Sequence, residues 1–158
     1  MNITHIITTI DRGGAENQLI QNLLLQSKKG INVSVLFLKG NSYWKKFLIE
    51  KNIKVFGPFF NSFYYLNIFG FISFYRNVNK NKQIIHCHMP PSLLLMTILL
   101  PFSKNKKIIY TSHNDEPFFP IKILDIIFSK HILNKANKIV AITTAVKRFL
   151  IKRYNINE

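Results

Sequence analysis

The sequence predicts an α/β domain, a doubly wound parallel sheet with helices on both of its faces. Short apolar runs rich in β-branched residues recur along the chain, longer segments with helical spacing lie between them, and several of the runs are almost wholly apolar. Such runs are typical of strands that helices cover on both faces. With 158 residues, 47% of them hydrophobic, the chain suits one compact domain over residues 1–158.

Six runs have the length and composition of strands. In chain order they are residues 3–9, 31–38, 53–56, 83–86, 107–111 and 138–142. Helical spacing is clearest in residues 15–27, after the first run, and in residues 144–154, after the last. Because strand and helix alternate, the strands should run parallel, and ligands should bind at their carboxyl ends.

The charge limits the classes of partner. Lys and Arg number 22 against 7 Asp and Glu, a formal net charge of +15. This excess favours nucleic acid or anionic lipid, or else reflects a genome rich in AT codons. Since the basic residues are dispersed and form no recognised nucleic-acid motif, we expect no nucleic-acid partner.

The sequence also gives an expectation about the compartment. Cys87 is the only cysteine, so no internal disulfide forms, and residues 1–10 lack the pattern of a signal peptide. The longest apolar stretch, residues 93–102, is much shorter than the ~20 residues of a spanning helix. We therefore expect a cytoplasmic protein.

A glycine pair follows the first predicted strand. Gly13 and Gly14 precede Glu16 at the start of the first predicted helix, where free N–H groups and the helix dipole suit a phosphate or a sugar. A tight turn without a ligand is the alternative. The chain has neither the G-x-G-x-x-G fingerprint of a nicotinamide dehydrogenase nor a P-loop.

Two histidines close the fourth predicted strand. Alternation puts His86 and His88 on the same side of the strand, where they could bind a polar substrate or a metal. Because residues 90–95 supply no carboxylate as a third ligand, we predict no metal site. One of the two is expected to be a structural histidine bonded to the backbone.

A polar segment, residues 110–116, closes the fifth strand. It contains His113 and Asn114, and polar groups at this end of a strand commonly face a ligand. His113 could hydrogen-bond a sugar hydroxyl or act near a reacting centre. The carboxylates that follow could equally belong to a helix start.

Four motifs in this order resemble the N-terminal domain of retaining glycosyltransferases of family four. They are Gly-Gly-Ala-Glu at 13–16, His-x-His at 86–88, Thr-Ser-His-Asn at 111–114 and Ala-Asn-Lys-Ile-Val-Ala-Ile-Thr at 136–143. The resemblance covers residues 2–157 and implies a Rossmann-like fold, one half of a GT-B enzyme. It also implies a hexosyltransferase that needs no cofactor.

The resemblance implies roles for the residues at the carboxyl ends of the strands. Gly13 and Gly14 would lie against the donor diphosphate and the acceptor, and His113 would contact the transferred sugar. The side chains expected in the same cleft are Glu16, His86, His88 and Asn114. Relatives continue into a second domain that binds the nucleotide sugar, and nothing in this sequence corresponds to it. A donor-binding half is therefore expected from elsewhere, for instance a partner chain.

An aromatic segment, residues 59–76, suggests where the domain docks. Phe and Tyr beside basic residues suit a bilayer interface, and equally a helix packed on the sheet. We expect a cell-envelope or lipid-linked glycan as acceptor, and peripheral association with the inner face of the plasma membrane. Two alternatives stay open: a non-catalytic remnant or membrane-docked binding subunit, and a metal hydrolase built on His86, His88 and His113.

Overall fold

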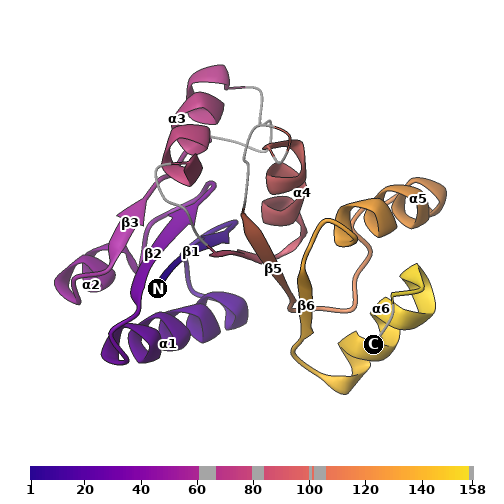
Figure 1. Cartoon of the computed structure of the whole chain (residues 1–158), viewed down its shortest axis with the longest axis horizontal. Helices are drawn as coiled ribbons and strands as arrows, with labels where there is room; N and C mark the ends of the chain where they lie inside the picture. The colour runs from indigo at the N-terminus through magenta and orange to yellow at the C-terminus, as the bar shows by residue number, and fades with distance from the viewer. Residues whose placement is uncertain (61–66, 80–83, 100, 102–105, 157–158) are drawn as a thin grey trace.

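The computed structural model describes residues 1–60, 67–79, 84–99, 101 and 106–156 (Figure 1). All six predicted strands are confirmed, with small differences at their ends. The strands are β1 (Asn2–Ile7), β2 (Asn32–Phe37), β3 (Lys54–Phe56), β4 (Ile84–His88), β5 (Lys107–Ser112) and β6 (Lys138–Ala141). The helices are α1 (Gly14–Lys28), α2 (Lys45–Glu50), α3 (Ile68–Asn79), α4 (Pro90–Leu99), α5 (Lys122–Leu133) and α6 (Thr144–Tyr154).

The strands form one parallel sheet in the order β3-β2-β1-β4-β5-β6. The chain builds outward from β1 through β2 to β3, returns to the other side of β1, and builds outward again through β4, β5 and β6. The order therefore reverses between β1 and β4. In a doubly wound sheet this switch point leaves a crevice at the carboxyl ends of the two strands, where ligands bind.

Helices cover both faces of the sheet, as predicted (Figure 1). On one face, α1 and α2 bury an apolar cluster that includes Leu19, Leu23, Val35 and Leu48. On the other face, a larger cluster joins the sheet to α3, α4, α5 and α6. The apolar alternation along the strands thus supplies two separate cores, one on each face.

A buried carboxylate fixes the last two helices to each other. Asp125 of α5 is fully buried, and Arg153 of α6 donates to it from 2.6 Å, while the Tyr154 hydroxyl donates from 3.0 Å. The backbone N–H groups of Phe118 and Phe119 also donate to Asp125, at 2.7 and 3.1 Å. This network sets the rotation of α5 about its own axis.

The structure divides the aromatic segment, residues 59–76, for which a bilayer interface and a helix packed on the sheet were equally expected. Phe59, Phe60 and Phe74 belong to the core, whereas Phe69 is 80% exposed. Residues 61–66 of the segment lie outside the described residues. Among the described helices, none is long and apolar enough to cross a membrane.

Candidate functional site

In the turn after β1, the carboxylate of Glu16 folds back over Gly13. Gly13 is extended and caps α1, and a Cβ on it would lie 2.3 Å from a carboxylate oxygen of Glu16. That carboxylate accepts a hydrogen bond from the hydroxyl of Thr9. No atom lies within 4 Å of a Cβ built on Gly14, so the first turn of α1 is open on that side. The free N–H groups of this turn suit an anion or a sugar.

Beside this turn, β4 ends in a strained backbone. Met89 has a φ of 72°, in the left-handed region that non-glycine residues rarely adopt. The hydroxyl of Ser92 donates to the carbonyl oxygens of His88 and Met89, at 2.7 and 2.9 Å, and so holds the turn. Such strain is commonly kept where a side chain must be placed for function. Here the side chain next to it is that of His88.

A row of hydrogen-bonded imidazoles crosses the switch point. Gln26 Oε1 lies 2.9 Å from His5 Nε2, His5 Nδ1 lies 3.1 Å from His88 Nε2, and His88 Nδ1 lies 3.1 Å from His113 Nε2. The row therefore starts at α1, passes through β1 and β4, and ends after β5. We call Gln26, His5, His88 and His113 the histidine row.

The row couples the tautomers of its members. A neutral imidazole has one N–H donor and one acceptor nitrogen. With the Gln26 oxygen as acceptor, His5 must carry its proton on Nε2, and His88 and His113 must then carry theirs on Nε2 as well. The Nδ1 atom of His113 is left unprotonated, so it can accept a hydrogen bond from a sugar hydroxyl.

Burial keeps the row neutral. Loss of solvent lowers the pKa of His5 from 6.5 to about 4, although the hydrogen bond with Gln26 opposes that change. Burial lowers the pKa of His88 as well, and three neighbouring histidines add to the effect. Burial also lowers the pKa of His113, against the opposing charge of Glu16. At neutral pH these rings therefore carry no charge.

His86 stands beside the row and is held separately. Its Nε2 lies 2.7 Å from the hydroxyl of Thr111 on β5, and its ring centroid lies 4.3 Å from that of His88. Burial lowers its pKa to about 3, with smaller contributions from the histidines around it. Both histidines of the predicted pair therefore bond to side chains. This differs from the expected bond between one of them and the backbone.

His5, His86 and His88 also form a group that could hold a metal ion. One nitrogen from each ring lies within 4.8 Å of the others. Zinc accepts three imidazoles with an open fourth position. In this structure the nitrogens of His5 and His88 that face each other are paired by a hydrogen bond, which a metal would have to displace. The predicted absence of a metal stays a prediction, which metal analysis of the purified protein can test.

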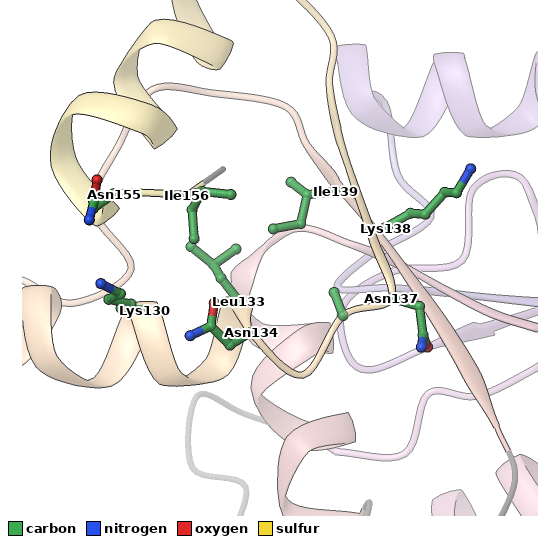
Figure 2. Close-up of a pocket in the computed structure, with 9 residues that line it drawn as sticks. Lys130, Leu133, Asn134, Asn137, Lys138, Ile139, Asn155 and Ile156 are labelled. Atoms are coloured by element: carbon green, nitrogen blue, oxygen red, sulfur yellow. The ribbon is translucent and has the colours of Figure 1, made fainter. Parts of the chain in front are cut away.

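Two cavities lie at different distances from the carboxyl ends of the strands. A cavity of about 260 Å³ adjoins them, between the start of α4 and the chain after β5, and is lined by Met89, Pro90, Pro91, Leu94, Asn114, Glu116, Pro117, Phe118 and Phe119. A larger one, about 810 Å³, lies at the amino end of β6 (Figure 2). Lys130, Lys138 and Asn155 are among its lining residues. The smaller cavity is the one beside the histidine row.

The predicted site residues lie at the carboxyl ends of β1, β4 and β5, though they do not all point at one another. His88 and His113 are in contact, and the charge of Glu16 acts on His113. Asn114 instead donates to Glu116 at 2.9 Å on the surface. His5 and Gln26 were not predicted. His5 sits within an apolar run, and only the register with His86 in the neighbouring strand indicates where it lies.

Comparison with known proteins identifies the family. The model of Glycosyltransferase Family 4 matches residues 12–158. Among curated proteins, none matches the sequence. HepE of Anabaena, solved in complex with UDP, superposes with a TM-score of 0.75 at 16% identity, over 100% of this chain and 43% of HepE. A second HepE structure holds UDP and glucose and superposes with a TM-score of 0.74.

A glycosyltransferase from Rickettsia africae has a TM-score of 0.73 at 21% identity, over 99% of this chain and 40% of its own. The chain thus spans about two fifths of the length of these structures. Its parallel sheet and the order of its elements agree with the Rossmann-like N-terminal half of a GT-B enzyme. Since the family model covers nearly all of the sequence, the chain belongs to glycosyltransferase family 4.

Proposed function

We propose that this chain is the acceptor-side domain of a glycosyltransferase that transfers a hexose from a nucleotide sugar to a cell-envelope or lipid-linked glycan. The main support for the proposal is that two kinds of binding group lie together at the switch point. The glycine turn before α1 and the end of the histidine row lie on the same edge of the sheet. Polar groups for a sugar and free N–H groups for a phosphate thus meet where the fold places ligands.

The donor side of the reaction comes from a half that is not among these residues. HepE structures contain UDP, and UDP with glucose, and this chain covers 43% of HepE. We propose that most contacts to the nucleotide belong to the remaining part of such an enzyme. That part would be supplied by the same longer protein or by a partner chain.

In this proposal the glycine turn, His113 and Glu16 have separate roles. The first turn of α1, which follows Gly13 and is open at Gly14, faces the diphosphate or the acceptor, and His113 hydrogen-bonds the transferred sugar. Glu16 tunes the charge near His113. The apolar part of the adjoining cavity, which includes Leu94 and Phe118, suits an acceptor with an apolar group.

Calorimetry with UDP- and GDP-sugars tests whether binding of the nucleotide sugar needs a second half. The chain alone should bind them only weakly, because the proposal assigns most contacts to the nucleotide to the remaining part of the enzyme. A low-micromolar dissociation constant, about −8 kcal/mol, would show that no second half is required.

A transfer assay tests the activity itself. Radiolabelled sugar should pass to a lipid-linked acceptor when a donor-binding half is added, as a fusion or as a second chain, and not without it. If no donor half restores transfer, the chain is a non-catalytic binding subunit, and the proposed activity is wrong.

A further inference from the structure

Helix α5 carries large apolar side chains on the side that faces away from the domain. Ile123 and Ile127 are 67% and 60% exposed, and Phe128 is 51% exposed. We call the whole set the α5 apolar patch: Ile121, Ile123, Leu124, Ile126, Ile127 and Phe128. Single exposed apolar residues are ordinary, but a contiguous group of this kind marks a surface that binds something.

The patch cannot turn inward. The opposite side of α5 is already buried, through Ser129, Ile132 and Leu133. The Asp125 network with Arg153 ties that buried side to α6. The outward side of the helix therefore stays apolar in the folded domain.

Positive charge lies at both ends of the patch. Lys122 stands at its start, and Lys130 stands in the last turn of the helix. Asp125, the only acidic residue of α5, is buried and paired with Arg153, so it does not offset these charges at the surface. Residues 117–156 contain eight lysines and arginines against this one acidic residue.

We propose that α5 docks this domain on an anionic bilayer. Its apolar patch would enter the boundary between head groups and acyl chains, and Lys122 and Lys130 would meet lipid phosphates. Charge complementarity favours this occupant over a second copy of the chain. Two patches brought face to face would also bring together two sets of lysines and no exposed carboxylate of α5.

The patch is continuous with the site. α5 starts shortly after the segment that carries His113, and the ring of Phe128 in the patch lies 6.3 Å from that of Phe119, which lines the 260 Å³ cavity. A bilayer bound by α5 would thus lie beside that cavity. The surface is distinct from the aromatic segment of residues 59–76, whose Phe59, Phe60 and Phe74 lie in the core.

Vesicle flotation with the full chain tests the proposal without any sugar transfer. We expect binding to vesicles of phosphatidylcholine with phosphatidylglycerol, and much weaker binding to phosphatidylcholine alone. The double variant Ile123→Gln/Ile127→Gln should lower the partition coefficient roughly tenfold or more, because it removes the two most exposed members of the patch. Leu25→Gln is the matched control, since Leu25 is 56% exposed on α1, and it should bind like the native chain.

A second variant tests the charge. Lys122→Gln/Lys130→Gln should weaken binding to the anionic vesicles only, and added salt should have a smaller effect on it than on the native chain. The proposal is overturned if the native chain ignores both vesicles, if it binds both equally, or if the patch variant binds like Leu25→Gln. Light scattering tests a second copy of the chain as another occupant: a dimer that Ile123→Gln/Ile127→Gln dissociates would assign the patch to that copy and overturn the proposal.

Discussion

His113 stands at the open end of a row whose other members are buried. One of its ring nitrogens already bonds to His88, so only the other is left to meet a substrate. The ring is thus oriented before any ligand arrives. A group held in this way contributes to the reacting geometry without further ordering.

We expect His113→Ala to lower turnover by roughly 10²-fold or more, as is typical when a positioned hydrogen-bonding or acid–base group is lost. The measurement needs the donor-binding half, supplied as a fusion or a second chain. The melting temperature should change little, because the half-buried ring occupies no apolar core.

Leu19→Ala provides the opposite control. Leu19 is fully buried on the inner side of α1, so its truncation should cost about 2–5 kcal/mol of stability through the cavity it leaves. The folded fraction should transfer sugar normally. If His113→Ala instead unfolds the domain and the remaining folded protein is fully active, His113 has a structural role only.

Gln26 determines the direction of the histidine row. Gln26→Leu removes the acceptor for His5 Nε2, so we expect His113 to lose its single tautomer and show a mixture. Long-range ¹H–¹⁵N spectra of the isolated chain report the protonated nitrogen of each ring, so no activity is needed. Gln26→Glu, which keeps an acceptor oxygen, should preserve the Nε2–H form. Identical His113 spectra for all three proteins would contradict coupling along the row.

At the scale of elements, the position of α5 depends on one side chain. Asp125 receives hydrogen bonds from Ser129 and Tyr154, besides its ion pair with Arg153. Burial by itself would raise the pKa of Asp125, and these bonds outweigh it, so that the pKa is lowered. The carboxylate thus stays ionised and joins α5, α6 and the segment before α5.

We expect Asp125→Ala to destabilise the domain by about 1–3 kcal/mol for each buried donor that loses its acceptor, among them the hydroxyls of Ser129 and Tyr154. Urea unfolding measures it. Arg153 is 25% exposed, so Arg153→Gln should cost less, because Asp125 keeps its other donors. Equal losses for the two variants would show that the pair, and not the whole network, holds the helices.

The elements were predictable from the sequence where their own residues carry the pattern of a strand or a helix. The run at residues 31–38 is apolar and β-branched, and it forms β2. His5 was missed because its significance depends on a neighbour far along the chain, His86 in β4. The apolar patch of α5 was missed for another reason: Ile123 and Ile127 resemble core residues, and only the fold shows that they face outward.

At the scale of the whole molecule, the reversal of strand order brings the site residues together and also buries most of them. The histidine row lies between β1 and β4, the pair of strands at which the order reverses. Covering helices exclude water from His5, while the carboxyl end of the sheet leaves His113 half-buried. The site therefore couples a surface group to the interior, and the pH dependence of folding should reveal this.

The domain should lose stability as the pH falls from 6.5 toward 4. In the folded state the pKa of His5 is about 4, below the 6.5 of the unfolded chain. Between these values the unfolded state binds a proton that the folded state does not, so the free energy of unfolding decreases by up to about 1.4 kcal/mol per pH unit for each such histidine. His88, whose pKa is also lowered, adds to the slope. Above pH 6.5 this contribution is constant, and Asp125 enters only below its ordinary value of 3.8.

Urea unfolding at about pH 7.5 and about pH 5 should therefore differ by about 2 kcal/mol for each fully buried histidine. His5→Asn is the matched variant, because it keeps a neutral hydrogen-bonding side chain and cannot bind the proton. It should be less stable than the native chain at the higher pH, since it leaves a gap at His88, and its stability should fall less on acidification. If the native chain is equally stable at both pH values, the folded and unfolded states take up equal numbers of protons over this range, so burial does not lower the pKa of His5 and His88. The neutral row, and with it the tautomer assigned to His113, would then be wrong.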